Sequence, residues 1–133
     1  FVAAARQRRY RTREGAEAHV TFRCQSVLER LRDDEREAVP ASSVDVVNSS
    51  GAVGCHFEAE ATAVLASEVD RVLRPGGLAL IDCGPDGTRS GELLAIFQER
   101  GFRPIHRARS CPFDRYWQIC FRKESPLRQP DSL

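Results

Sequence analysis

The chain has 133 residues, of which 41% are hydrophobic and 29% are charged, and its formal net charge is +1. This length suffices for one domain with a single core and is too short for two. The composition is typical of a soluble globular protein. The small net charge argues against nucleic acid or an anionic membrane as partner, and no apolar run reaches the ~18–20 residues that a membrane span needs.

The cysteine pattern predicts a reduced, cytoplasmic protein without a metal site. Five scattered cysteines contain no CxxC pair, and their number is odd. A reduced cysteine in a strand behaves as a small apolar residue. The only neighbouring soft ligands are Cys55 and His56, and two adjacent residues do not form a tetrahedral metal cage.

The first third of the chain predicts a helix, a strand and a second, short helix. Residues 1–15 are rich in alanine and end on Gly15, which suits a helix C-terminus. The arginines of this segment surround the helix, which favours a solvated surface over a nucleic-acid-binding one. Residues 18–24 alternate as in a half-buried strand, and Ser26 with Glu29 predicts a capping box for a helix over 27–32.

The middle of the chain predicts a strand, a long helix and a buried strand. Residues 43–49 read as a short strand, followed by a loop with two glycines and a helix over 57–73. Pro75 ends that helix, and Gly76 and Gly77 are expected to supply positive φ values for a turn over 74–77. The apolar run that begins residues 78–83 does not alternate, so we expect this strand and 44–48 to be adjacent and buried on both faces.

The last third predicts a helix and an antiparallel hairpin. A turn-rich loop over 84–91 leads into a helix over 92–100 that Gly101 closes. Residues 102–110 and 116–122 alternate and are joined by a short loop, which indicates a β-hairpin, and residues 124–133 are expected to be disordered. The order α-β-α-β-α-β-α-β-β predicts a Rossmann-like, doubly wound α/β fold with a mostly parallel sheet.

Two corners of this chain resemble a known family. The segment EVDRVLRPGG at 68–77, followed by an apolar strand, resembles the corner between the fourth helix and fifth strand of class I S-adenosylmethionine (SAM)-dependent methyltransferases. ERGFRPI at 99–105 resembles their next helix-to-strand corner. The resemblance covers residues 1–123 as the C-terminal half of the domain. It implies SAM as cofactor.

The resemblance also implies that the fold is incomplete. The family's Gly-rich loop after its first strand has no counterpart here, because the chain contains no GxGxG. The chain lacks methionine and begins with Phe1, so we expect a fragment of a longer polypeptide. The family's first two strands lie between its third and fourth, so an N-terminal segment or a second chain is expected to complete the sheet. Residues 20–24 should then stay outside the ladder of 44–48.

Seven residues are the candidate site that the resemblance implies. Three would border the adenine of SAM and three its methionine moiety, since ligands of open α/β sheets bind beyond the carboxyl ends of the strands: Cys24, Gln25 and Ser26; Asn48, Ser49 and Ser50. Ser26 stands where the family usually has an aspartate. His56 is the candidate catalytic base towards an acceptor O–H or N–H. Its alternative role is to pack against or cap the start of the following helix.

The first functional hypothesis is a SAM-dependent methyltransferase acting on a small molecule. N-S-S-G stands after the fourth strand where base-methylating enzymes carry an NPPY-like tetrad, which disfavours a nucleic-acid base as acceptor. The alternative is a non-catalytic methyltransferase-like partner or scaffold module without a complete SAM site. Because half of the site is absent from these residues, the chain alone is expected to bind SAM weakly or not at all.

Overall fold

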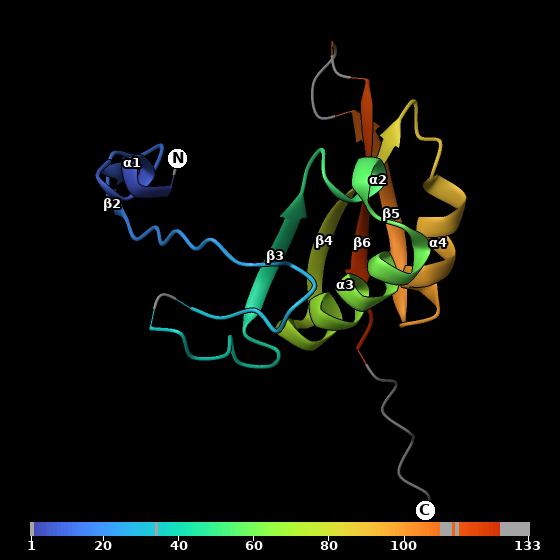
Figure 1. Cartoon of the computed structure of the whole chain (residues 1–133), viewed down its shortest axis with the longest axis horizontal. Coiled ribbons are helices and arrows are strands. Elements are labelled where there is room, and N and C mark those ends of the chain that lie inside the picture. The colour runs from blue at the N-terminus through green and yellow to red at the C-terminus, as the bar shows by residue number, and fades with distance from the viewer. Residues whose placement is uncertain (1, 34, 110–112, 114, 126–133) are drawn as a thin grey trace, which may run out of the picture. The chain divides into compact units, whose positions relative to one another are not determined.

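The computed structural model describes residues 2–33, 35–109, 113 and 115–125 (Figure 1). The chain divides into two compact units, Phe1–Val39 and Pro40–Leu133. The expected disordered tail lies, from residue 126 onward, outside the described residues. The assignment of residues 1–123 to one portion of a methyltransferase domain stays a prediction.

The first unit has little regular structure, which corrects three predictions. Helix α1 (Val2–Arg6) covers only part of the helix predicted over 1–15. β1 (Tyr10–Arg11) and β2 (Glu17–Ala18) form a small antiparallel hairpin. The strand predicted over 18–24 therefore reaches only Ala18, and the helix predicted over 27–32 is a turn and a bend. Isolated short helices and unpaired strands are marginal in water, so local preference did not suffice here.

The second unit contains a four-stranded mixed sheet in the order β3-β4-β6-β5 (Figure 1). Its strands are β3 (Val44–Ser49), β4 (Leu73–Pro85), β5 (Phe102–Arg109) and β6 (Tyr116–Lys123). β3 and β4 pair in parallel, whereas β4–β6 and β5–β6 pair antiparallel. The predicted C-terminal hairpin is confirmed. The mostly parallel Rossmann-like sheet is not, because one of the three pairings is parallel.

Three helices accompany this sheet: α2 (Val53–His56), α3 (Ala59–Val72) and α4 (Ser90–Gln98). α3 and α4 cover one face, and their buried residues form a single core with those of the strands (Figure 1). Phe97 of α4 stacks on Phe121 of β6 with ring centroids 4.6 Å apart. Phe102 meets the same Phe97 edge-on at 5.3 Å. The longest helix has 14 residues, and none of the described helices is long and apolar enough to span a membrane.

The other face of the sheet is only partly buried, which corrects the prediction of two buried faces. β3 and β4 are adjacent as predicted, and Ala79 and Ile81 are completely buried under the helices. On the opposite face, Val46 is 52% exposed and Leu80 is half-buried. The reason is that the core formed by α3 and α4 lies on one side of the sheet. Val64 of α3 is 47% exposed, so it lies outside this core.

The predicted turn over 74–77 is a large irregularity of β4. Val44 pairs with Leu73, and the next pairing joins Val46 to Leu78, so the residues between bulge out of the ladder. Gly76 has the predicted positive φ, 80°. Gly77 does not; it is needed for space, because a Cβ there would lie 2.9 Å from the Arg74 carbonyl oxygen.

Residues 20–24 form no strand in the described part of the chain, and β3 is an edge of its sheet. That residues 20–24 stay outside the ladder of β3 stays a prediction. The strand predicted for them is wrong. A strand needs a neighbouring strand for its backbone hydrogen bonds, and its alternating pattern says nothing about where that neighbour would come from.

Candidate functional site

The carboxyl end of β3 presents three small polar residues in a row. Asn48 and Ser49 end the strand and Ser50 follows it. Asn48 and Ser50 are exposed, whereas Ser49 is half-buried. Gln118 of β6 reaches across the sheet: its side-chain amide donates to the Asn48 side-chain oxygen and to the Ser49 carbonyl oxygen, each at 3.1 Å. This edge thus offers hydroxyl and amide groups on a strand end that Gln118 holds in place.

Asp82 anchors the segment that follows. Its carboxylate accepts three backbone N–H groups at the start of α2, from Ala52 at 3.2 Å, Val53 at 3.1 Å and Gly54 at 2.8 Å. Asp82 is fully buried. A buried carboxylate is tolerated when its oxygens are hydrogen-bonded, and bonds from N–H groups to a charged acceptor are stronger than neutral ones. The loop after β3 is therefore tied to the end of β4.

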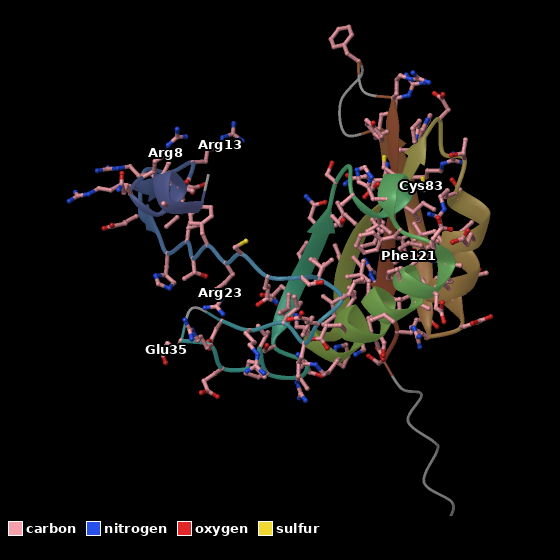
Figure 2. All side chains as sticks on the ribbon, viewed as in Figure 1. Arg8, Arg13, Arg23, Glu35, Cys83 and Phe121 are labelled. Carbon is pink, nitrogen blue, oxygen red and sulfur yellow. The ribbon has the colours of Figure 1, made fainter. Side chains whose placement is uncertain are left out.

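The segment after β3 also approaches the end of β4 closely, at Gly54 and Gly84. A Cβ on Gly54 would lie 1.9 Å from the Gly84 backbone nitrogen and 2.5 Å from the Cys83 carbonyl carbon. Gly84 itself has a φ of 80°. Figure 2 shows Cys83 beside α2, at the end of the sheet. Only residues without a side chain allow this approach of α2 to β4. A cavity of about 10 Å³ beside Asp82 has room for about one water molecule.

His56 is the last residue of α2, and its side chain is exposed. Its backbone N–H donates to the Ala52 carbonyl oxygen at 2.9 Å. No side-chain partner of His56 is found in the described part of the chain. The N-cap of α3 is Glu58, and no side chain caps that helix by a hydrogen bond. The imidazole is thus accessible, close in sequence to the polar end of β3.

The three residues predicted for the adenine side belong to the first unit. Cys24 and Ser26 are exposed, and Gln25 is half-buried. The Ser26 hydroxyl accepts the Leu28 N–H at 3.2 Å, and the Gln25 side-chain oxygen accepts the Arg32 N–H at 3.3 Å. The predicted capping box becomes this local turn. The arginines of this unit include Arg8 and Arg13, which project outward (Figure 2).

Sequence reasoning missed Asp82 and Gln118. Asp82 ends an apolar run, and a charged residue at the carboxyl end of a buried strand is a signal that could have been used. Gln118 carries no such signal, because its partners lie 69 and 70 positions away in the chain. Among the described residues, no group of three His, Cys, Asp or Glu side chains is placed to hold a metal ion.

No protein-family model and no curated protein matches this chain. Several solved structures do. A 1,6-didemethyltoxoflavin-N1-methyltransferase from Burkholderia thailandensis, solved with 1,6-didemethyltoxoflavin and S-adenosylhomocysteine, is 20% identical with a TM-score of 0.57 over 79% of this chain and 51% of its own. The N-methyltransferase NodS from Bradyrhizobium japonicum is 15% identical with a TM-score of 0.57 over 81% of this chain and 62% of its own. A TehB-like SAM-dependent methyltransferase from Corynebacterium glutamicum is 18% identical with a TM-score of 0.52 over 66% of this chain and 52% of its own.

These matches confirm the resemblance in fold that the sequence predicts: the chain shares a mixed α/β fold with class I SAM-dependent methyltransferases. At these identities the similarity is one of fold. The chain spans about half of the length of two of these structures and 62% of the third.

Proposed function

We propose that this chain contributes part of the cofactor site of a SAM-dependent methyltransferase that acts on a small molecule. The observation that carries the proposal is the polar carboxyl end of β3, Asn48–Ser50, on a parallel strand pair of a methyltransferase-like fold. In open α/β sheets, ligands bind beyond the carboxyl ends of the strands. Among the similar structures, the Burkholderia enzyme holds a small-molecule substrate and S-adenosylhomocysteine.

The residues at the carboxyl end of β3, Asn48–Ser50, fit the methionine end of SAM. The methionine moiety carries an ammonium and a carboxylate, which call for acceptors and donors, and the exposed Asn48 and Ser50 offer both. The N–H groups at the start of α2 are held by Asp82. The carboxylate of the cofactor would therefore bind to the groups of Asn48–Ser50. Cys24, Gln25 and Ser26 stay the proposed adenine-side residues.

When bound, SAM supplies an activated methyl group, so the protein's task is mainly alignment. His56 would lie on the acceptor side and take a proton from an O–H or N–H of the acceptor. Its exposed imidazole supports this role. No observation favours the alternative of a non-catalytic scaffold module.

The exposed edge of the sheet supports a proposal about what completes the site. β3 pairs on one side with β4 and is the edge strand of its sheet. Unpaired strand edges are templates for a further strand. We propose that an N-terminal segment or a second chain pairs there and supplies the missing half of the SAM site. A cytoplasmic location and the lack of a nucleic-acid or membrane partner stay predictions.

Calorimetric titration with SAM tests the function. The 133-residue chain should bind weakly or not at all, whereas the full-length native protein should bind at about micromolar Kd, near −8 kcal/mol. In the full-length protein, Ser50→Ala should weaken binding. Ser43→Ala is the matched control, because Ser43 precedes the first residue of β3 and its hydroxyl donates to the Pro40 carbonyl oxygen. A full-length protein that fails to bind SAM at millimolar concentration contradicts the proposal, and so does equal binding by both serine variants.

A further inference from the structure

The segment from Ser50 to His56 has little of its own to hold it in shape. Its sequence, SGAVGCH, contains two glycines and no large side chain except His56. Glycine-containing loops lose much conformational freedom when they are ordered. The four-residue helix α2 within it is far shorter than a helix that is stable alone. The order of this segment must therefore come from contacts with the rest of the fold.

Those contacts converge on the end of β4. Three consecutive N–H groups of the segment, those of residues 52–54, donate to one carboxylate, that of Asp82. Val53 and Gly54 are themselves buried, and the Gly54 backbone rests on that of Gly84. A hydrogen bond to a charged group contributes more than one to a neutral group. Asp82 thus binds residues 52, 53 and 54 together through one carboxylate.

We infer that Asp82 is a positioning residue: it holds the Ser50–His56 segment in the shape that a cofactor and an acceptor would meet. The inference rests on the proposed function for its consequence in binding. Asp82 is buried and its oxygens accept hydrogen bonds from residues 52–54. It would therefore affect a bound ligand only through the Ser50–His56 segment. Loss of its charge should loosen the segment at both ends, at Ser50 beside the strand end and at His56 at the close of α2.

Asp82→Asn is the informative variant because it keeps the size of the side chain. One oxygen becomes an NH2 group, which cannot accept an N–H, so at least one of the three bonds is lost and the others lose their charge. Asp86→Asn is the matched control. Asp86 follows four residues later, and its exposed carboxylate pairs with Arg115 at 3.1 Å.

The first measurement is amide hydrogen exchange of residues 52–54, with Ile119 and Phe121 as core references. Exchange at 52–54 should become about tenfold faster or more in Asp82→Asn, as expected from the loss of a charge-assisted hydrogen bond. The core references should change much less, and Asp86→Asn should match the wild type. Unchanged exchange at 52–54, or an equal acceleration of loop and core, overturns the inference.

The second measurement is the Kd for SAM in the full-length native protein. Asp82→Asn should raise this Kd about tenfold, and Asp86→Asn should leave it within twofold. A loosened loop with an unchanged Kd overturns the positioning role. If the wild-type protein does not bind SAM, the proposed function fails, and the exchange experiment still decides whether Asp82 holds the loop.

Discussion

Lys123 of β6 donates a hydrogen bond of 3.0 Å from its ammonium group to the carbonyl oxygen of Leu73, the C-cap residue of α3 and the first residue of β4. The same ammonium group donates to the Asp70 carbonyl oxygen and pairs with the Asp70 carboxylate at 3.0 Å. The Lys123 side chain is 16% exposed. A cation at a helix C-terminus satisfies free carbonyl groups and complements the helix dipole.

Lys123→Met should lower the free energy of unfolding by about 1–3 kcal/mol, because the part-buried Asp70 and Leu73 carbonyl groups lose a charged donor. Urea denaturation measures the change. Arg103→Met is the control, since Arg103 pairs with Glu124 at 3.3 Å with both side chains more than half exposed. Exposed pairs contribute about 0–1 kcal/mol. Equal losses in the two variants would show that Lys123 does not stabilise the helix end.

Gly54→Ala should be strongly destabilising or displace α2, because its Cβ would lie 1.9 Å from the Gly84 nitrogen. We expect the free energy of unfolding to fall by about 1–3 kcal/mol or more, since 1–3 kcal/mol is the usual cost of overpacking. Gly91→Ala is the control: Gly91 lies in α4, and a Cβ there meets nothing within 4 Å. Alanine is the better helix former, so this variant should be neutral or more stable by up to about 1 kcal/mol. Thermal melts of both variants check the pair.

Ile81→Ala tests whether β4 is the central strand. Ile81 is completely buried between β3, β6 and the helices, so the free energy of unfolding of this variant should fall by ~2–5 kcal/mol. Val46→Ala, on the edge strand and 52% exposed, should lose much less. A loss below about half a kcal/mol for Ile81→Ala would mean that this residue is not part of the core, given the usual range for such truncations.

The reactivity of Cys120 should depend on folding and on pH. Partial burial raises the pKa of the Cys120 thiol, and the charge of Arg122 offsets part of that effect. The thiolate is the reactive form, so iodoacetamide should label Cys120 more slowly in the folded protein than in urea, and more slowly than the exposed Cys24. Peptide mass spectrometry separates the two sites.

The same shift has a consequence for stability with a definite sign. A folded pKa above the unfolded one favours folding while the thiol stays protonated. The contribution is present below the ordinary cysteine pKa of 9.0 and is lost as the pH rises through the raised folded value. Cys120→Ser should reduce the loss of stability as the pH rises above 9.0. An identical pH dependence in variant and wild type would contradict the burial effect.

His56→Ala should lower the turnover of the full-length protein with an accepted substrate by roughly a hundredfold or more, the usual contribution of a general base. The Kd for SAM should stay within twofold, because His56 is assigned to the acceptor side. His106→Ala is the control, since His106 is exposed on β5, the opposite edge of the sheet from β3. An unchanged rate in His56→Ala would leave His56 only a packing role near the start of α3.

Much of the second unit could be predicted from the sequence because its signals are local. The Pro75–Gly77 corner and the alternation of β5 and β6 each concern residues close together in the chain. Gly76 has the predicted positive φ, 80°. The polar end of β3 could also be found this way, since Asn48 and Ser49 are the last residues of a strand whose apolar centre marks it.

The tertiary structure decided the features that depend on contacts between segments far apart in the sequence. The strand predicted over 18–24 does not form, since alternation indicates a face but supplies no partner strand. The exposed side of β3 follows from having helices over one face of the sheet. The anchors of the candidate site, Asp82 and Gln118, bond to groups 28–30 and 69–70 positions away. These partners are too far apart in the sequence to be recognised as a pair, because they meet only when the strands lie side by side.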